Sequence, residues 1–211
     1  MLNKTGARGL VAHVIDPVAK GLLKIGLTPD AVTFIGTAGV SAAALAFYSR
    51  GSFWIGTLVI AVFIFSDMLD GSMARQSGKG GKWGAFLDST LDRVADGAIF
   101  ASLLIWFSRT EQWGLVTAVT ICLIGGAVVS YAKARAEGLG MECNVGFAER
   151  TERIVIVLIP TFLAGLGVPF IQPIALWVLA ALTVLTVGQR MVHVRKQALG
   201  PTAVDGAGEA A

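Results

Sequence analysis

The sequence predicts an all-α integral membrane protein in which six transmembrane helices follow an interfacial amphipathic helix. Of its 211 residues, 55% are hydrophobic and only 15% are charged, and the mean hydropathy is +0.71. Soluble domains carry roughly 25% charged residues, so this composition argues against both an ordinary soluble protein and a disordered one. Six long apolar runs and an uneven distribution of Lys and Arg support the same fold class.

The first element, residues 1–28, is predicted to lie along the membrane surface. Apolar residues including Val14 and Leu22 recur at helical spacing opposite Lys20 and Lys24, a pattern typical of interfacial helices. Charges interrupt each apolar stretch, so the segment does not resemble a cleaved signal peptide. Two interpretations of its role stay open, a simple anchoring lead-in to the first span and a role over the functional site.

Residues 29–196 are predicted to form the six-span domain. A bilayer core of about 30 Å needs about 20 apolar residues in a helix. The runs cover approximately 31–48, 53–70, 84–107, 113–132, 154–168 and 171–189, and the fifth is the shortest. Residues 197–211, rich in Ala and Gly, are predicted to form a disordered tail.

Basic residues predict the orientation of these spans. Lys and Arg gather before the first run and after the second, fourth and sixth, whereas only Arg50 and Arg109 lie on the opposite side. Because cytoplasmic loops collect Lys and Arg, we expect both termini on the cytoplasmic side of the cell (plasma) membrane. These loops account for the net charge of +3, and no nucleic-acid partner is expected.

Four aspartates near the turn between the second and third runs are the candidates for chemistry. Asp67 and Asp70 are spaced i, i+3, and Asp88 and Asp92 are spaced i, i+4, so each pair shares a face of its helix. A charged side chain inside a bilayer costs about 2.5 to 3.5 kcal/mol, so four together indicate a function. If residues 76–83 form the turn, an antiparallel pair of helices brings all four carboxylates to one region near the cytoplasmic face.

Such a cluster predicts bound cations. Four converging carboxylates cannot all stay ionised without positive charge nearby, and their hard oxygen donors favour two Mg²⁺ ions, with Mn²⁺ as an alternative. Two such ions suit phosphoryl transfer, because they polarise phosphoryl oxygens and stabilise a leaving phosphate. Two other interpretations stay open, a buried ion network with Arg75 and Arg93 and the cation pathway of a transporter.

The aspartates belong to a longer motif. It reads Asp67-x-x-Asp70-Gly71-x-x-Ala74-Arg75, then eight residues, then Gly84-x-x-x-Asp88-x-x-x-Asp92. This pattern resembles in full the motif of the CDP-alcohol phosphotransferase family, whose members transfer a phosphatidyl-type group from a CDP-linked lipid to an alcohol and release CMP. The resemblance implies metal ligation by Asp67, Asp70 and Asp88, and it implies that Asp92 is the base for the acceptor hydroxyl and a further metal ligand.

The same resemblance implies a site for the CDP-linked lipid. Its candidates in the motif are Gly71, Ala74 and Arg75, with Arg75 directed towards the diphosphate. The segment LTPDAVT before the first span is similar to the family's approach to the nucleotide, which adds Pro29, Asp30 and Thr33. The alternative for this segment is a helix start, because Thr-Pro-Asp suits an N-terminal turn.

Basic residues at the cytoplasmic ends of the last three runs are candidates for holding a phosphate on the acceptor. The alternative is that these basic residues only orient the protein in the membrane and pair locally with glutamates. The segments YAKARAEGLG, AERTERIVI and VGQR resemble a group within the family, the actinobacterial phosphatidylinositol phosphate synthases. That likeness implies an acceptor pocket of Lys133, Arg153 and Arg190, with Arg195 as the alternative third cation. It also implies CDP-diacylglycerol and inositol 1-phosphate as substrates, and a homodimer.

Three other functions are alternatives to this one. Phosphatidylglycerophosphate synthases share the aspartate motif and also take a phosphorylated acceptor, glycerol 3-phosphate. The charge of the basic residues therefore does not distinguish this activity from phosphatidylinositol phosphate synthesis. Aspartate-rich membrane prenyltransferases are disfavoured because their carboxylate pairs lie far apart in the chain. A transporter is disfavoured because the latter half of the sequence shows no second aspartate cluster.

Overall fold

The computed structural model describes residues 15–78 and 81–200, and every regular element in these ranges is helical. The chain forms two compact units, Met1–Ser102 and Leu103–Ala211. The first unit holds a helix over residues 15–24, helix α2 (Pro29–Phe47), the short 3-10 helix η1 (Tyr48–Arg50) and helix α3 (Phe53–Ser77). Helix α4 (Lys82–Arg109) begins in this unit and ends in the second.

Local sequence sets where α2 begins. The hydroxyl of Thr28 caps the helix by accepting a hydrogen bond of 3.2 Å from the backbone N–H of Ala31. Pro29 follows in the first turn, where its missing N–H costs nothing. The alternative interpretation of LTPDAVT as a helix start is therefore correct, and it is compatible with a second role for the same residues.

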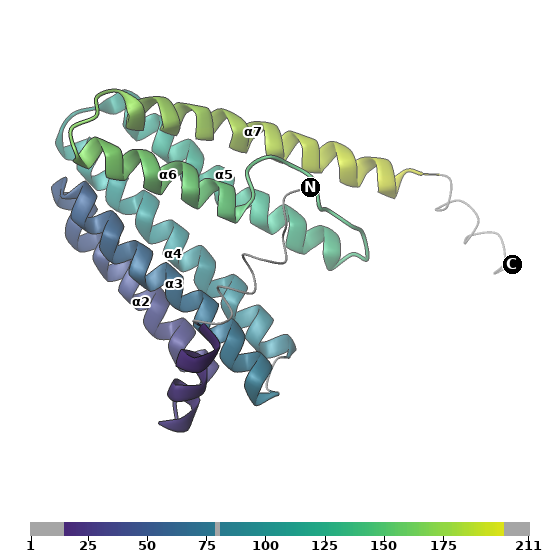
Figure 1. Ribbon diagram of the computed structural model, residues 1–211. Coiled ribbons are helices and arrows are strands. Elements are labelled where there is room, and N and C mark those ends of the chain that lie inside the picture. Colours follow the sequence, from purple (N-terminus) through teal and green to yellow (C-terminus); the bar gives the residue numbers. More distant parts are fainter. Residues whose placement is uncertain (1–14, 79–80, 201–211) are drawn as a thin grey trace, which may run out of the picture. The chain divides into compact units, whose positions relative to one another are not determined.

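Helices α2 and α3 pack against each other (Figure 1). A Cβ atom on Gly39 would lie 2.2 Å from the ring of Phe63, so only a glycine lets the two helices approach at this point. The hydroxyls of Tyr48 and Thr57 form a buried hydrogen bond of 2.7 Å near the turn between them. Gly39 is thus used for packing within the chain.

The second unit contains the end of α4, helix α5 (Trp113–Glu137), helix α6 (Arg150–Gly165) and helix α7 (Ile171–Ala198). Helix α7 packs against both α5 and α6 (Figure 1). A Cβ atom on Gly125 would lie 2.5 Å from the Thr183 methyl group, which explains the small residue on α5. The amide of Gln172 donates a 3.1 Å hydrogen bond to the hydroxyl of Thr161 and joins α6 to α7.

Four helical stretches in the described residues are long and apolar enough to cross a membrane, namely 29–50, α3, α5 and α7. The sequence predicts six spans, and the other two candidates are α4 and α6. Helix α4 has sufficient length, but it carries the charged residues Asp88, Asp92, Arg93 and Asp96, whereas α6 has only 16 residues.

Several boundaries differ from the predicted ones. Helices α3, α5 and α7 continue past the predicted ends of their apolar runs, to residues 77, 137 and 198, and α6 begins at Arg150. Helix α7 therefore includes the first two residues of the predicted tail. Residues 1–14, in the predicted amphipathic helix, and residues 201–211, in the predicted tail, lie outside the described ranges.

Candidate active site

The motif aspartates lie on two consecutive helices separated by residues 78–81. Asp70 lies about two turns before the end of α3, and Asp88 lies about two turns after the start of α4. Gly78 follows α3 with φ 64°, a left-handed conformation that glycine adopts without steric cost. The connection is shorter than the predicted 76–83 because both helices extend into that range.

A cavity of about 390 Å³ in the first unit is formed by residues of α2, the end of α3 and the start of α4. The lining residues are Pro29, Asp30, Thr33, Asp70, Gly71, Ala74, Gly81, Gly84, Ala85 and Asp88. Two of the predicted metal ligands and five of the six predicted CDP-lipid residues therefore share one cavity. The motif glycines and alanines leave this space open because they carry little or no side chain.

Asp70 is buried and held by a side chain from α2. Its carboxylate Oδ2 accepts a hydrogen bond of 2.6 Å from the hydroxyl of Thr33, and only 8% of each residue is exposed. A short hydrogen bond to an ionised carboxylate is stronger than one between neutral groups. Thr33 thus fixes the orientation of a predicted metal ligand, which gives this residue a physical role beyond the start of a helix.

Two further contacts order the cavity walls. The indole Nε1 of Trp83 donates a 2.9 Å hydrogen bond to Asp30 Oδ2, which joins the first turn of α4 to the first turn of α2. On α3, a Cβ atom on Gly71 would lie 3.6 Å from Arg75 Nη1. Arg75 does not line the cavity, but its guanidinium lies beside a residue that does.

The structure does not assign the other two motif aspartates to this cavity. Asp92 is not among the lining residues; its side chain is 14% exposed, and its Oδ2 lies 3.7 Å from Arg93 Nη2. The side chain of Asp67 lies outside what the structure describes. Among the described side chains, no three Asp, Glu, His or Cys residues form a metal-binding group, so the four-aspartate site remains a prediction. The carboxylates of Asp70 and Asp88 in one cavity are nevertheless the hard donors that a divalent cation requires.

The helix at residues 15–24 packs on the motif segment of α3, a relationship that the sequence did not reveal. Ser72, only 1% exposed, donates a 2.6 Å hydrogen bond to Asp16 Oδ1, and Gln76 Nε2 donates one of 3.2 Å to the Asp16 carbonyl. Ala19 and Met73 are fully buried in the same small core. The face of α3 next to Asp70 and Gly71 is therefore covered by the N-terminal helix.

In the second unit, two of the predicted acceptor cations are almost completely buried. Arg153 is 1% exposed and Arg190 is 2% exposed. Arg153 Nη1 donates to the carbonyl of Ala148 at 3.1 Å, and its Nε would lie 3.2 Å from a Cβ atom on Gly126. Gly126 thus allows the guanidinium to lie against α5.

Hydrogen bonds of Arg190 join three parts of the second unit. Its Nη1 donates to the carbonyl of Val129 at 2.6 Å, its Nε to the carbonyl of Val145 at 2.9 Å, and its Nη2 to Glu149 Oε1 at 3.3 Å. These bonds connect α7 to α5 and to the loop before α6. Arg190 therefore has a structural role that its position in the sequence did not indicate.

The remaining two cations are more accessible. Lys133 Nζ lies 4.0 Å from Glu137 Oε1 on the same helix, a partly exposed pair, and Arg195 is exposed in the last turn of α7. Gly126, Val129 and Lys133 are spaced i, i+3, i+7 and share a face of α5. Arg153 lies beside Gly126, and Arg190 bonds to the Val129 carbonyl. Together with Lys133 itself, three predicted acceptor residues therefore lie along one face of α5.

Comparisons with known proteins agree on one family. The family model of CDP-alcohol phosphatidyltransferases matches residues 26–187. A phosphatidylinositol phosphate synthase of Streptomyces avermitilis is 52% identical over 205 residues, which cover 93% of this chain and 84% of that protein.

Two crystal structures of Mycobacterium tuberculosis phosphatidylinositol phosphate synthase are also similar to the structure of this chain. The one with CDP-DAG bound gives a TM-score of 0.84 at 42% identity and covers 92% of this chain and 98% of that chain. The one in complex with manganese and citrate gives a TM-score of 0.81 at 42% identity and covers 90% of this chain and 92% of that chain. The family model and these relatives therefore match most of the chain and not the aspartate motif alone.

Proposed function

The chain belongs to the CDP-alcohol phosphatidyltransferase family, and from this premise we propose that it is a multi-pass membrane enzyme that makes phosphatidylinositol phosphate. It transfers the phosphatidyl group of CDP-diacylglycerol to inositol 1-phosphate and releases CMP. The observation that carries the proposal is the cavity in which Asp70 and Asp88 lie beside the predicted nucleotide residues. Relatives 41% to 52% identical over most of the chain have the same named activity.

The cavity binds the CDP part of the lipid substrate. Gly71 and Ala74 leave room for the diphosphate, and Arg75 beside Gly71 supplies positive charge. Pro29, Asp30 and Thr33 form the α2 side of the cavity. A guanidinium suits a phosphate because its planar array of N–H donors matches the phosphate oxygens.

Divalent cations, Mg²⁺ or Mn²⁺, are the cofactor, and Asp67, Asp70, Asp88 and Asp92 are the residues that hold two of them. The donor chemistry fits, because carboxylate oxygens are the ligands that these ions prefer. When bound, the ions supply charge stabilisation at the phosphoryl oxygens. Thr33 keeps Asp70 oriented for this purpose through the 2.6 Å hydrogen bond.

Asp92 accepts the proton of the attacking hydroxyl. The hydroxyl oxygen of the acceptor forms a bond to the phosphorus that carries the lipid, and the bond from that phosphorus to the CMP oxygen breaks. The proton moves to the Asp92 carboxylate and CMP leaves with the electron pair. The side chain of Asp92 is 14% exposed, so it is mostly buried but not fully enclosed.

The acceptor phosphate is held by Lys133 and Arg153, with Arg190 or Arg195 as the third cation. The shared face of α5 supports the set with Arg190, whose guanidinium is fixed by three hydrogen bonds. A fixed guanidinium loses little freedom when it binds an anion. Arg195 is exposed at the end of α7 and needs no rearrangement to be reached.

All six long helices span the membrane, with both termini and the active site on the cytoplasmic side, and two copies form a homodimer. Helix α6, at 16 residues, is about 24 Å long, which a slightly thinned bilayer accommodates. Gly39 and Gly125 pack against side chains of the same chain, so these two glycines serve packing within one subunit.

One assay tests the reaction and its acceptor. Purified protein is incubated with CDP-diacylglycerol, Mg²⁺ and either inositol 1-phosphate or glycerol 3-phosphate, and CMP release is followed. We expect release with inositol 1-phosphate and little with glycerol 3-phosphate. The reverse preference would assign the chain to phosphatidylglycerophosphate synthesis, and no CMP release with any alcohol would refute the enzymatic proposal.

A further inference from the structure

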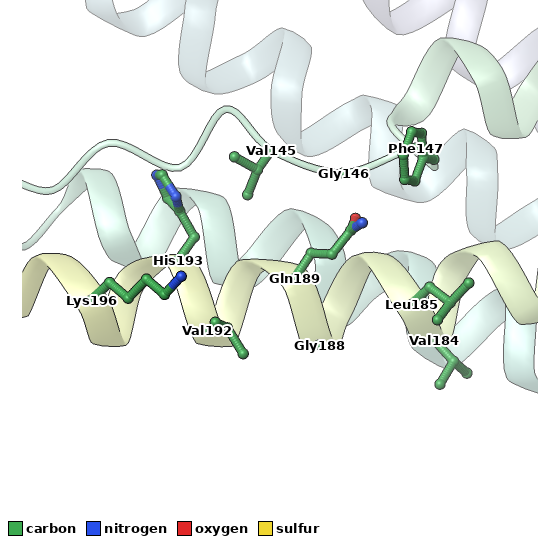
Figure 2. A pocket seen from close by; sticks show the side chains of 10 residues that line it. All are labelled: Val145, Gly146, Phe147, Val184, Leu185, Gly188, Gln189, Val192, His193 and Lys196. Atoms are coloured by element: carbon green, nitrogen blue, oxygen red, sulfur yellow. The ribbon is translucent and has the colours of Figure 1, made fainter.

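The second unit contains a groove along α7 that the proposed reaction does not use. It has a volume of about 640 Å³ and lies between α7 and the loop before α6 (Figure 2). The lining residues are Val145, Gly146, Phe147, Val184, Leu185, Gly188, Gln189, Val192, His193 and Lys196. We call this the α7 groove. None of these residues belongs to the predicted substrate or metal sites.

The loop wall of the groove is held in place by α7 itself. The hydroxyl of Thr186 accepts hydrogen bonds from the backbone N–H groups of Phe147 at 3.2 Å and Ala148 at 3.1 Å. Gly146 has φ 122°, and a Cβ atom there would lie 2.3 Å from the Thr186 methyl group. With Arg190 bound to the carbonyl of Val145, the wall is preformed.

The groove changes character along its length. Val184 and Leu185 are 58% and 57% exposed at one end, whereas Val192 is an exposed apolar residue within the other end. Gln189, His193 and Lys196 are spaced i, i+4, i+7 and form a polar stripe. Figure 2 shows Gln189 and His193 rising from α7 towards the loop. The groove is therefore apolar at one end and polar and cationic at the other.

This gradient matches a phospholipid. Helix α7 is a candidate membrane span, and Val184 to Lys196 extends about 18 Å along it. Lys residues near the end of a span place their charge at the headgroup level. Val184 and Leu185 match the acyl chain, whereas Lys196 and His193 match an anionic phosphate.

We propose that the α7 groove binds one anionic phospholipid, with an acyl chain along Val184 and Leu185 and its phosphate at His193 and Lys196. A bare helix face would contact many lipids transiently. Here the loop wall makes the surface concave, and the polar stripe gives it a preference for headgroup charge. The lipid is a bound component rather than a substrate, so this site does not depend on the proposed reaction.

Binding is measured by native mass spectrometry of the full chain in detergent with added phosphatidylglycerol or phosphatidylcholine. The groove is filled by Gly188→Trp, and Gly114→Trp on α5 is the matched control, since a Cβ atom at either glycine has no neighbour within 4 Å. We expect Gly188→Trp to lose the bound phosphatidylglycerol and Gly114→Trp to retain it. Equal retention by both would overturn the proposal.

Charge preference is tested separately. Lys196→Ala should lower the preference for phosphatidylglycerol over phosphatidylcholine about fivefold, whereas Lys20→Ala, which removes the same charge in the first unit, should not. Equal losses would show a general charge effect and refute the site.

Displacement of the lipid by inositol 1-phosphate or inorganic phosphate would indicate a site for free anions, and displacement by CDP-diacylglycerol would indicate a substrate site. Either displacement would also refute the proposal.

Discussion

Replacing Thr33 by Val should weaken cation binding while leaving the fold intact. Valine has nearly the shape of threonine, but it cannot donate the 2.6 Å hydrogen bond to Asp70 Oδ2. A hydrogen bond to a charged group contributes about 1.5 to 3 kcal/mol, and loss of a residue that orients a metal ligand typically costs about 10- to 100-fold in metal affinity or activity. The two ranges agree, since about 1.4 kcal/mol corresponds to tenfold.

The assay is CMP release as a function of Mg²⁺ concentration at saturating CDP-diacylglycerol. We expect Thr33→Val to require about 10- to 100-fold more Mg²⁺ for half-maximal activity, and Thr33→Ser to stay close to the parent because it keeps the hydroxyl. Thr37→Val is the matched control, since Thr37 lies one turn along α2, is also 8% exposed and does not line the cavity. An unchanged Mg²⁺ dependence in Thr33→Val would refute the positioning role.

Three further variants test other parts of the account. Asp92→Asn should abolish CMP release while CDP-lipid and Mg²⁺ binding stay largely intact in equilibrium measurements, because Asp67, Asp70 and Asp88 remain as metal ligands, and surviving activity would show that another group takes the proton. Arg153→Ala should raise the KM for the phosphorylated acceptor far more than that for CDP-diacylglycerol; equal rises would contradict the pocket. Gly39→Ala should lower the thermal unfolding midpoint, because overpacking against Phe63 costs about 1 to 3 kcal/mol, whereas Gly97→Ala, with open space at its Cβ position, should not lower it.

The sequence predicted the hairpin of α3 and α4 well because charges inside apolar runs stand out. The sequence predicts four aspartates in one region; Asp70 and Asp88 line one cavity, Asp92 is not among its lining residues, and the side chain of Asp67 lies outside the described structure. Helix ends were predicted less well. Hydropathy marks where a chain leaves the hydrocarbon core, but a helix such as α7 continues into the polar region as far as Ala198, where composition gives no signal.

Pairings between distant residues could not be predicted. Asp16 and Ser72 are 56 residues apart, and neither is unusual in its local sequence. Arg190 was identified as a cation near a membrane interface, but two of its partners are backbone carbonyls, which no sequence pattern displays. A count of basic residues therefore does not distinguish a guanidinium that braces the fold from one that binds a ligand.

The packing of residues 15–24 on α3 has a practical consequence for anyone who shortens this protein. The helix ends at residue 24, and a turn with φ 87° at Gly26 and a 3.1 Å hydrogen bond from Leu27 N–H to the Leu22 carbonyl separates it from α2. A truncation at this turn removes the whole helix. Doing so would bring Ser72 and Met73, next to the aspartate motif, into contact with solvent. Expression designs that trim the amino terminus beyond Ile15 would therefore uncover the face of α3 next to the aspartate motif.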